Sequence, residues 1–226
     1  MRTKKSLLLI PFVLFFLPDL SRATISLPSA IHDMSHHHAT VRNDLIDPAA
    51  FQVTMRKLWE QHIILTRLYL VSTIQNFGDQ DLVLQSLLQN QIDIGNAFKT
   101  FYGNEAGDQL SSLLTDHIKF AGEIISDLIA SKTAEAGIAV TAWYSNADDL
   151  AMFLNNANPT NWHLSDLQTM LHAHLDLTSS EVKDEIAKDY IDSASVFTQI
   201  SNQILSMADV LSSGVMKQFP GMFQGH

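Results

Sequence analysis

The sequence predicts an all-α protein, organised as a six-helix bundle of three antiparallel helical hairpins that repeat about every 56 residues. Three observations support this fold class. Apolar residues recur every three or four positions from about residue 47 to 212, without the alternation expected of a strand. Short turn sequences interrupt this periodicity. A histidine within an apolar stripe recurs at His62, His117 and His174, which indicates repeated units.

The first expected helix begins at Pro48, because Asp47 is a favourable N-cap and proline suits the first helical position. It ends before Gly78, since glycine commonly follows a helix end. A second helix is expected from about residue 80 to 101 and should stop at a turn around Gly103. A third follows from residue 104 to about Ala130.

The fourth expected helix follows a break at residues 131–133 and ends near Asn156, before the loop 158–161. A fifth begins near Leu164. The capping-box pattern at residues 178–181 would start a new helix there, but the repeat places the turn at 187–190, and we predict the later turn. The last helix is expected to reach Ser212, with a bend at Gly214.

Residues 1–23 have the organisation of a signal peptide. A basic start precedes an apolar run of about 12 residues and the small-x-small sequence that ends at Ala23. This run is too short for a membrane-spanning helix, which needs about 20 residues. We therefore expect an exported protein, periplasmic or secreted, with a flexible arm at 24–46, one helical-bundle domain at 47–226, and no stable membrane insertion after cleavage.

Composition narrows the possible functions. The chain has no cysteine, so disulfides and thiolate chemistry are excluded. It carries 14 basic and 24 acidic residues, and loss of the leader would leave a net charge near −13. Such a charge repels nucleic acid and attracts cations. We expect no nucleic-acid partner, while a protein partner cannot be named from the sequence.

The recurrent histidines are followed by Asn-x-x-Asp or its remnant. In each expected hairpin these groups lie at a similar height above the turn, so side-by-side hairpins would place them in one layer. Buried imidazole and carboxylate groups together suit a divalent transition metal. The predicted ligands are His62, His117, His174, Asp93 and Asp149, and the predicted supporting residues are Asn90, Asn146 and Asn202.

Two alternatives remain open. The layer could be a hydrogen-bonded core in a structural or interaction protein, with function on the acidic faces or the tail from Phe219 to Phe223. It could also line a pocket for a small organic ligand. Leu205 replaces the aspartate in the third copy, with Asp209 as a possible substitute. Arg67 is expected to pair with a buried acid such as Asp93 or Asp149, or to extend to solvent. No motif identifies a reaction.

Four stretches resemble a family of exported, all-helical bacterial proteins without an established activity. They are Leu58–Arg67, Leu87–Gly103, Trp143–Leu154 and Met207–Pro220, which contain LWxxH, NxxDIxxAF and WYxNADD motifs. The similarity extends over about residues 50–220. The resemblance implies an exported helical protein and a turn near residue 187, and it implies no particular chemistry.

Overall fold

The all-α prediction is confirmed by the structure, a computed structural model that describes residues 45–225. Within this range the only strand-like pairing is one β-bridge, and no helix is long and apolar enough to cross a membrane. The elements are α1 (Pro48–Ile74), α2 (Gln80–Ile129), α3 (Thr133–Ala157), α4 (Leu164–Ala187), α5 (Tyr190–Gln218) and the short 3₁₀ helix η1 (Pro220–Met222).

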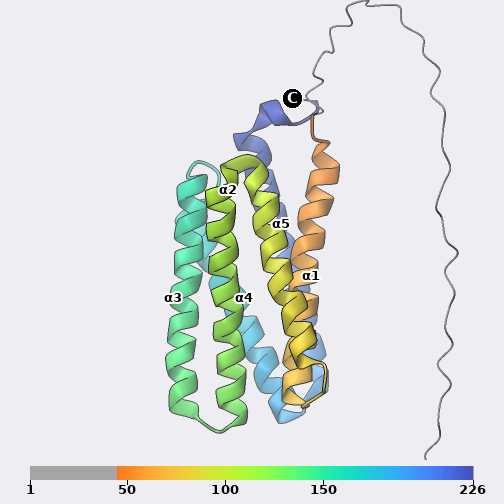
Figure 1. The fold of residues 1–226 in the computed structure, drawn as a ribbon, viewed down its shortest axis with the longest axis vertical. Helices are drawn as coiled ribbons and strands as arrows, with labels where there is room; N and C mark the ends of the chain where they lie inside the picture. The colour runs from red at the N-terminus through yellow and green to blue at the C-terminus, as the bar shows by residue number, and fades with distance from the viewer. Residues whose placement is uncertain (1–44, 226) are drawn as a thin grey trace, which may run out of the picture. The chain divides into compact units, whose positions relative to one another are not determined.

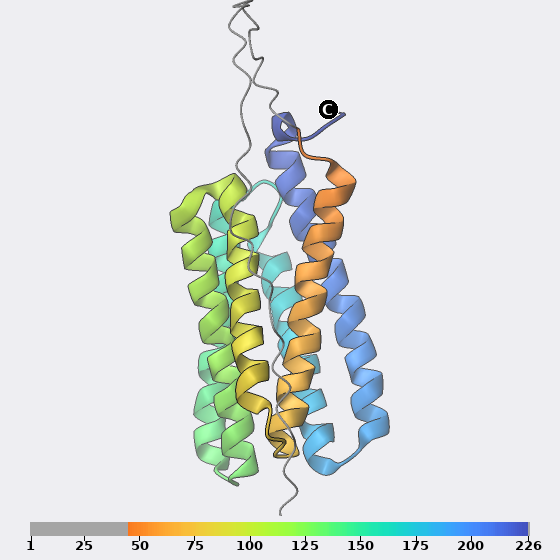
Figure 2. The ribbon, with the colours of Figure 1, turned by 45° about the vertical axis from the view of Figure 1, so that its right-hand side comes forward.

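The helices form a closed bundle around one apolar core. Each helix packs against the next in the chain, and α1 also packs against α5, so the first and last helices lie side by side (Figures 1 and 2). The core runs through the centre and includes Phe51, Trp59, Trp143 and Trp162. Burial of these large side chains supplies the main stabilising free energy in a chain without disulfides.

The predicted count of six helices is wrong for the described residues, because the expected second and third helices are the two limbs of α2. At the bend Gly103 has φ 85° and ψ 170°, a conformation that favours glycine. Figure 1 shows one limb rising to this bend and the other returning beside it. The limbs come so close that a Cβ on Gly107 would lie 2.5 Å from the carbonyl oxygen of Gly95, and Lys99 pairs with Asp108 across them at 2.5 Å.

Most other expected boundaries are confirmed. Asp47 caps α1 by accepting a 3.0 Å hydrogen bond from the amide of Ala49. Helix α4 continues through residues 178–181 and ends at Ala187, as the late turn requires. Lys188 then adopts the left-handed conformation, with φ 62°. The capping-box pattern therefore does not start a helix in this context.

The expected end of the last helix at Ser212 is wrong, since α5 continues to Gln218. Gly214 lies within this helix, against the indole of Trp162 from the loop between α3 and α4. The same loop is tied to α5 by Asn158, which donates a 2.9 Å hydrogen bond to the carbonyl oxygen of Gly214. Glycine here permits close contact between the loop and the helix rather than a bend.

The chain just before α1 pairs with the C-terminal tail. Ile46 donates to the carbonyl of Met222 and accepts from the amide of Gln224, both at 2.9 Å. Phe223 is 1% exposed and packs against Phe51, so the tail is part of the core rather than a free aromatic surface. The predicted signal peptide and all of the predicted arm except residues 45 and 46 lie outside the described residues.

A glycine substitution in α5 tests the packing of the loop against this helix, and one in α3 serves as the comparison. We expect Gly214→Ala to destabilise the protein by about 1–3 kcal/mol, because the new Cβ would lie 2.0 Å from Nε1 of Trp162. Gly137→Ala in α3 should stabilise it by about 1 kcal/mol, because no atom lies within 4 Å of that Cβ and alanine favours a helix. Urea unfolding of both variants measures this, and equal stabilities would contradict the packing argument.

Candidate functional site: three histidines around a buried cavity

The three recurrent histidines come together in the middle of the bundle. His62 lies on α1, His117 on the second limb of α2 and His174 on α4, and their exposed fractions are 3%, 5% and 5%. All three line one internal cavity of about 40 Å³. The ring centroids of His62 and His174 are 6.1 Å apart. The sequence-based prediction of a shared histidine layer is therefore correct in its histidines.

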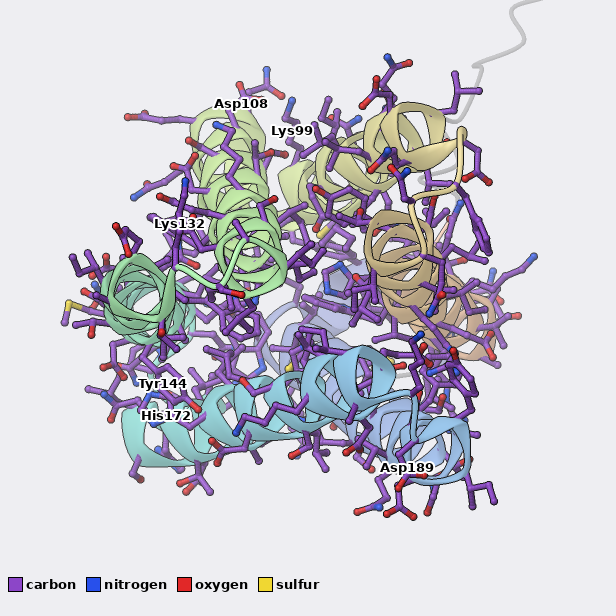
Figure 3. The ribbon with its side chains drawn as sticks, turned by 90° about the horizontal axis from the view of Figure 1, so that it is seen from below. Lys99, Asp108, Lys132, Tyr144, His172 and Asp189 are labelled. Carbon is purple, nitrogen blue, oxygen red and sulfur yellow. The ribbon has the colours of Figure 1, made fainter. Side chains whose placement is uncertain are left out.

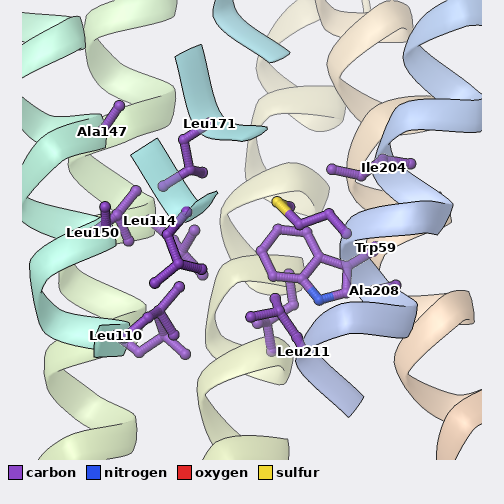
Figure 4. Close-up of a cluster of buried hydrophobic side chains, with 14 of the residues drawn as sticks. Trp59, Leu110, Leu114, Ala147, Leu150, Leu171, Ile204, Ala208 and Leu211 are labelled. Carbon is purple, nitrogen blue, oxygen red and sulfur yellow. The ribbon is translucent and has the colours of Figure 1, made fainter. Parts of the chain in front are cut away.

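Each histidine takes its place from the apolar stripe that precedes it. On α1 the residues one and two turns before His62 are the buried Trp59 and Met55. The remaining wall of the cavity is apolar, and Figure 4 shows much of it. The labelled residues there that line the cavity are Trp59, Leu110, Leu114, Leu150, Leu171, Ile204 and Leu211.

The tautomer of His117 follows from its contact with Asn146. The amide nitrogen of Asn146 donates a 3.1 Å hydrogen bond to the carbonyl oxygen of Leu113, so its Oδ1 must face the imidazole. Nδ1 of His117 lies 2.8 Å from this Oδ1 and is therefore the protonated nitrogen. The lone pair of the neutral ring is then on Nε2, which makes no hydrogen bond to residues 45–225.

Glutamine side chains take the corresponding place beside the other two rings. Gln91 and Gln203 lie beside the rings of His62 and His174, and these amides oppose the lowering of the imidazole pKa values. Nδ1 of His62 and of His174 and the two glutamine Oε1 atoms are enclosed, yet none is in hydrogen-bonding geometry with a described residue.

The amide side chains also connect neighbouring helices. Asn90 donates to the carbonyl oxygen of Leu58 at 3.1 Å, and Gln203 donates to that of Met170 at 2.9 Å. Leu58, Leu113 and Met170 each lie four residues before a layer histidine. The residues 29 positions after the three histidines are Gln91, Asn146 and Gln203. A spacing of 28 residues from His174 selected Asn202 and missed Gln203, which a spacing of 29 residues would have found.

The predicted Asp and Asn positions are only partly correct. Asn90 and Asn146 are buried beside the layer, as expected. Asn202 and Asp149 are exposed, and Asp93 is half-buried and accepts a 3.0 Å hydrogen bond from Gln89 on its own helix. Three residues advance a helix by about 300°, which turns each aspartate about 60° away from the face of its asparagine. The expected carboxylates are therefore absent from the cavity wall.

Burial keeps the three imidazoles neutral. Desolvation is the main cause that lowers the pKa of His62 to about 3 and those of His117 and His174 to about 4. Repulsion between the rings lowers the pKa values of His62 and His117 further, while the neighbouring amides act in the opposite direction. Among residues 45–225, no three His, Asp or Glu side chains stand close enough to hold a metal ion without rearrangement.

A buried ionic cluster on one side of the layer was not anticipated. Arg67 contacts the carboxylate of Glu181 and lies 3.4 Å from Glu185, not beside Asp93 or Asp149. Its guanidinium also lies 4.9 Å from the ring centre of Phe197. Burial raises the pKa of Glu181, and Arg67 opposes this rise. The sequence signal for this cluster was the pair Glu181 and Glu185, which lie four residues apart and therefore on one face of a helix.

Acid should destabilise the protein through the histidine layer. The folded-state pKa values lie below the ordinary value of 6.5, so as pH falls the unfolded chain binds protons first. The stability that depends on the neutral rings is fully present above pH 6.5, and it decreases as the pH falls from 6.5 towards 4. Three such groups reduce the free energy of unfolding by about 4 kcal/mol per pH unit. Urea unfolding at pH 7.5, 6 and 5 measures this slope.

One substitution isolates the contribution of a single ring. His117→Leu should reduce the slope by about 1.4 kcal/mol per pH unit, because the unfolded chain then loses one proton-binding group. His163 is exposed at the start of α4 and provides the control, since His163→Gln should leave the slope unchanged. Equal slopes in both variants would show that the buried ring does not titrate as described.

The register of the third amide can also be tested. Gln203→Met should destabilise the protein by about 1–3 kcal/mol, because it removes the donor to Met170 and the amide beside His174. Asn202→Met should change the stability by less than about 0.5 kcal/mol, since that side chain is exposed. Thermal unfolding of the pair measures the difference. A larger loss in the Asn202 variant would restore the spacing first predicted from the sequence.

The chain matches no protein-family model, and no curated protein or solved structure shows significant similarity to it. The resemblance to a family of exported bacterial proteins therefore stays a prediction. The arguments about function depend on the geometry of the histidine layer and the pockets around it.

Proposed function

We propose that this is an exported helical-bundle protein that binds one divalent transition-metal ion through His62, His117 and His174. The observation that carries the proposal is that three neutral imidazoles from three helices line one cavity. Neutral imidazole is the form that binds a metal, so the lowered pKa values favour binding at neutral pH. Zinc, copper, nickel and iron ions all accept such ligands.

The amides beside the rings support this assignment. A metal-binding histidine usually donates its second ring N–H to an oxygen, which fixes the tautomer and the orientation of the ring. The Oδ1 of Asn146 has this position beside His117, and Gln91 and Gln203 lie beside the other two rings. In each ring Nε2 is then the atom available to the ion.

Binding requires the rings to approach one another, because no three His, Asp or Glu side chains among residues 45–225 stand close enough to hold an ion. Two imidazoles that share one ion through Nε2 have ring centres about 5–6 Å apart, given metal–nitrogen distances of about 2 Å. His62 and His174 stand 6.1 Å apart, so a small change in side-chain torsions would suffice for this pair. The three ligands carry no charge, and with Asp93 and Asp149 outside the layer a fourth ligand would come from solvent.

Two finer features belong to the same proposal. We attribute the three histidine–amide units to duplication of one hairpin, because an amide side chain lies 29 residues after each histidine, and the carbonyl four residues before each histidine accepts a hydrogen bond from an amide. We also propose export, periplasmic or secreted, on the basis of the signal-peptide pattern in residues 1–23.

A structural role for the layer is the second candidate, and a specific observation favours it. Asn90, Asn146 and Gln203 each donate to the backbone of a neighbouring helix or helix limb, so the layer holds the bundle in register whether or not an ion binds. In that case the function lies on the surface. The two candidates differ in their response to metal, because an ion that binds only the folded state stabilises it by about 2.7 kcal/mol at a hundredfold excess over its dissociation constant.

Elemental analysis distinguishes these candidates. The tag-free exported protein, with residues 36–38 changed from histidine to glutamine to remove a second binding tract, should contain close to one metal ion per chain after loading. His117→Ala should lose that ion and the associated gain in thermal stability. Asp149→Asn is the matched control, since this exposed carboxylate should not affect metal content.

The other outcomes are equally informative. Metal content that is far below one per chain, together with unfolding that is insensitive to both metal and chelator, would establish the structural role. Loss of metal in the Asp149 variant would show that the bundle rearranges to bring this carboxylate to the ion.

A further inference from the structure

A second, larger pocket lies beside the histidine layer. It has a volume of about 440 Å³ and is lined by α1, both limbs of α2, α3 and α4, near the end of the bundle seen in Figure 3. Pockets of about 300–1,000 Å³ with mostly apolar walls are typical sites for small organic ligands. Its lining shares no residue with that of the 40 Å³ cavity.

The pocket begins one helical turn from the histidines. Thr66, Ala121 and Thr178 line it and each follows a layer histidine by four residues. Thr66 and Thr178 donate hydrogen bonds to the carbonyl oxygens of His62 and His174, at 2.8 and 2.9 Å. These hydroxyls are therefore occupied by the backbone and offer the ligand mainly their methyl groups.

Trp143 separates the pocket from the cavity. Its indole lines the pocket, and its ring lies 5.2 Å from that of His117. Tryptophan fluorescence from this position would therefore respond to a ligand in the pocket. The interior wall is completed by aliphatic side chains, including Leu87, Ile124 and Val182.

Charged groups occur only towards the opening. Asp176 and Lys183 line the pocket and are exposed. Asp176 already accepts a hydrogen bond from the hydroxyl of Tyr144, whereas no carboxylate among the described residues lies within 4 Å of the Lys183 ammonium group. The pocket thus combines a largely apolar interior with a lysine that forms no ion pair with residues 45–225.

We propose that this pocket binds a single-chain aliphatic carboxylate, with its alkyl chain against the aliphatic wall and its carboxylate beside Lys183. The strongly acidic surface of the protein disfavours non-specific capture of anions, so recognition of the head group depends on this lysine. The proposal is independent of metal binding, because the ligand contacts none of the three histidines.

Titration calorimetry with octanoate, decanoate and dodecanoate, each below its micelle concentration, tests the proposal on the exported protein. We expect one site per chain, and an affinity that rises about fourfold for each added methylene group, since each buries further apolar surface. Decanoate should bind more tightly than 1-decanol, and quenching or a shift of Trp143 fluorescence should follow the same binding curve.

Substitutions locate the site. A Cβ on Gly137 meets no atom within 4 Å, and this residue lines the pocket, so Gly137→Trp should fill it without disturbing the core and abolish binding. Gly137→Ala and Ile138→Trp, the latter at a neighbouring position with 73% exposure, should retain binding. Lys183→Met should weaken decanoate binding about three- to fivefold, whereas Lys57→Met, which removes the same charge from α1, should not.

Three results would overturn the proposal. The absence of saturable binding would show that the pocket has no such ligand, and unchanged binding in Gly137→Trp would place the ligand elsewhere. Equal affinities for decanoate and decanol, with no effect of Lys183→Met, would exclude recognition of a carboxylate.

Discussion

The structure depends on how three imidazoles are accommodated in an apolar core. A buried polar ring without a partner costs free energy, and a charged one costs more, so the rings stay neutral and lie beside amide groups. Asn146 shows the full arrangement, in which one side chain contacts the ring of His117 and the backbone of the opposite limb. At His117 the side chain that accommodates the histidine therefore also fixes the height of α3 relative to α2, and Asn90 and Gln203 make similar contacts to the backbone of α1 and α4.

This layer divides the interior of the bundle into two parts. On one side the small cavity is bounded by Trp59 and leucine side chains, and on the other the larger pocket begins at Thr66 and Thr178. The threonine hydroxyls bond to the histidine carbonyls, so they connect the wall of the pocket to the helical turns that carry the rings. Trp143 lies between the two spaces.

Helical periodicity was sufficient to predict the fold class, the histidine layer and the turn at residue 187, because these depend on which face of a helix is apolar. The features that failed depend on contacts between distant segments. In the sequence Gly214 resembles the glycine that commonly follows a helix end, and the close contact with Trp162 explains why it lies within α5 instead. Asp93 follows Asn90 by less than one helical turn, so the aspartate of the Asn-x-x-Asp motif does not lie on the same helix face as the asparagine. Gln203 was missed because a shift of one residue in the repeat separates it from Asn202.

The asymmetry of each ring bears on the choice between a metal site and a purely structural layer. A structural histidine gains most when both nitrogens have partners, because each unpaired buried nitrogen costs about 1–3 kcal/mol. Around His117 the protein supplies an oxygen to Nδ1 and only apolar neighbours in the cavity that its ring lines, and three rings from separate helices meet there. Nδ1 of His62 and Nδ1 of His174 also lack a described partner, and the three rings surround a space of about 40 Å³, which is large enough for a water molecule or an ion. The unpartnered nitrogens thus favour a bound ligand as the reason for the layer. Because no carboxylate from residues 45–225 lines the cavity, the charge of a bound ion would be balanced from solvent.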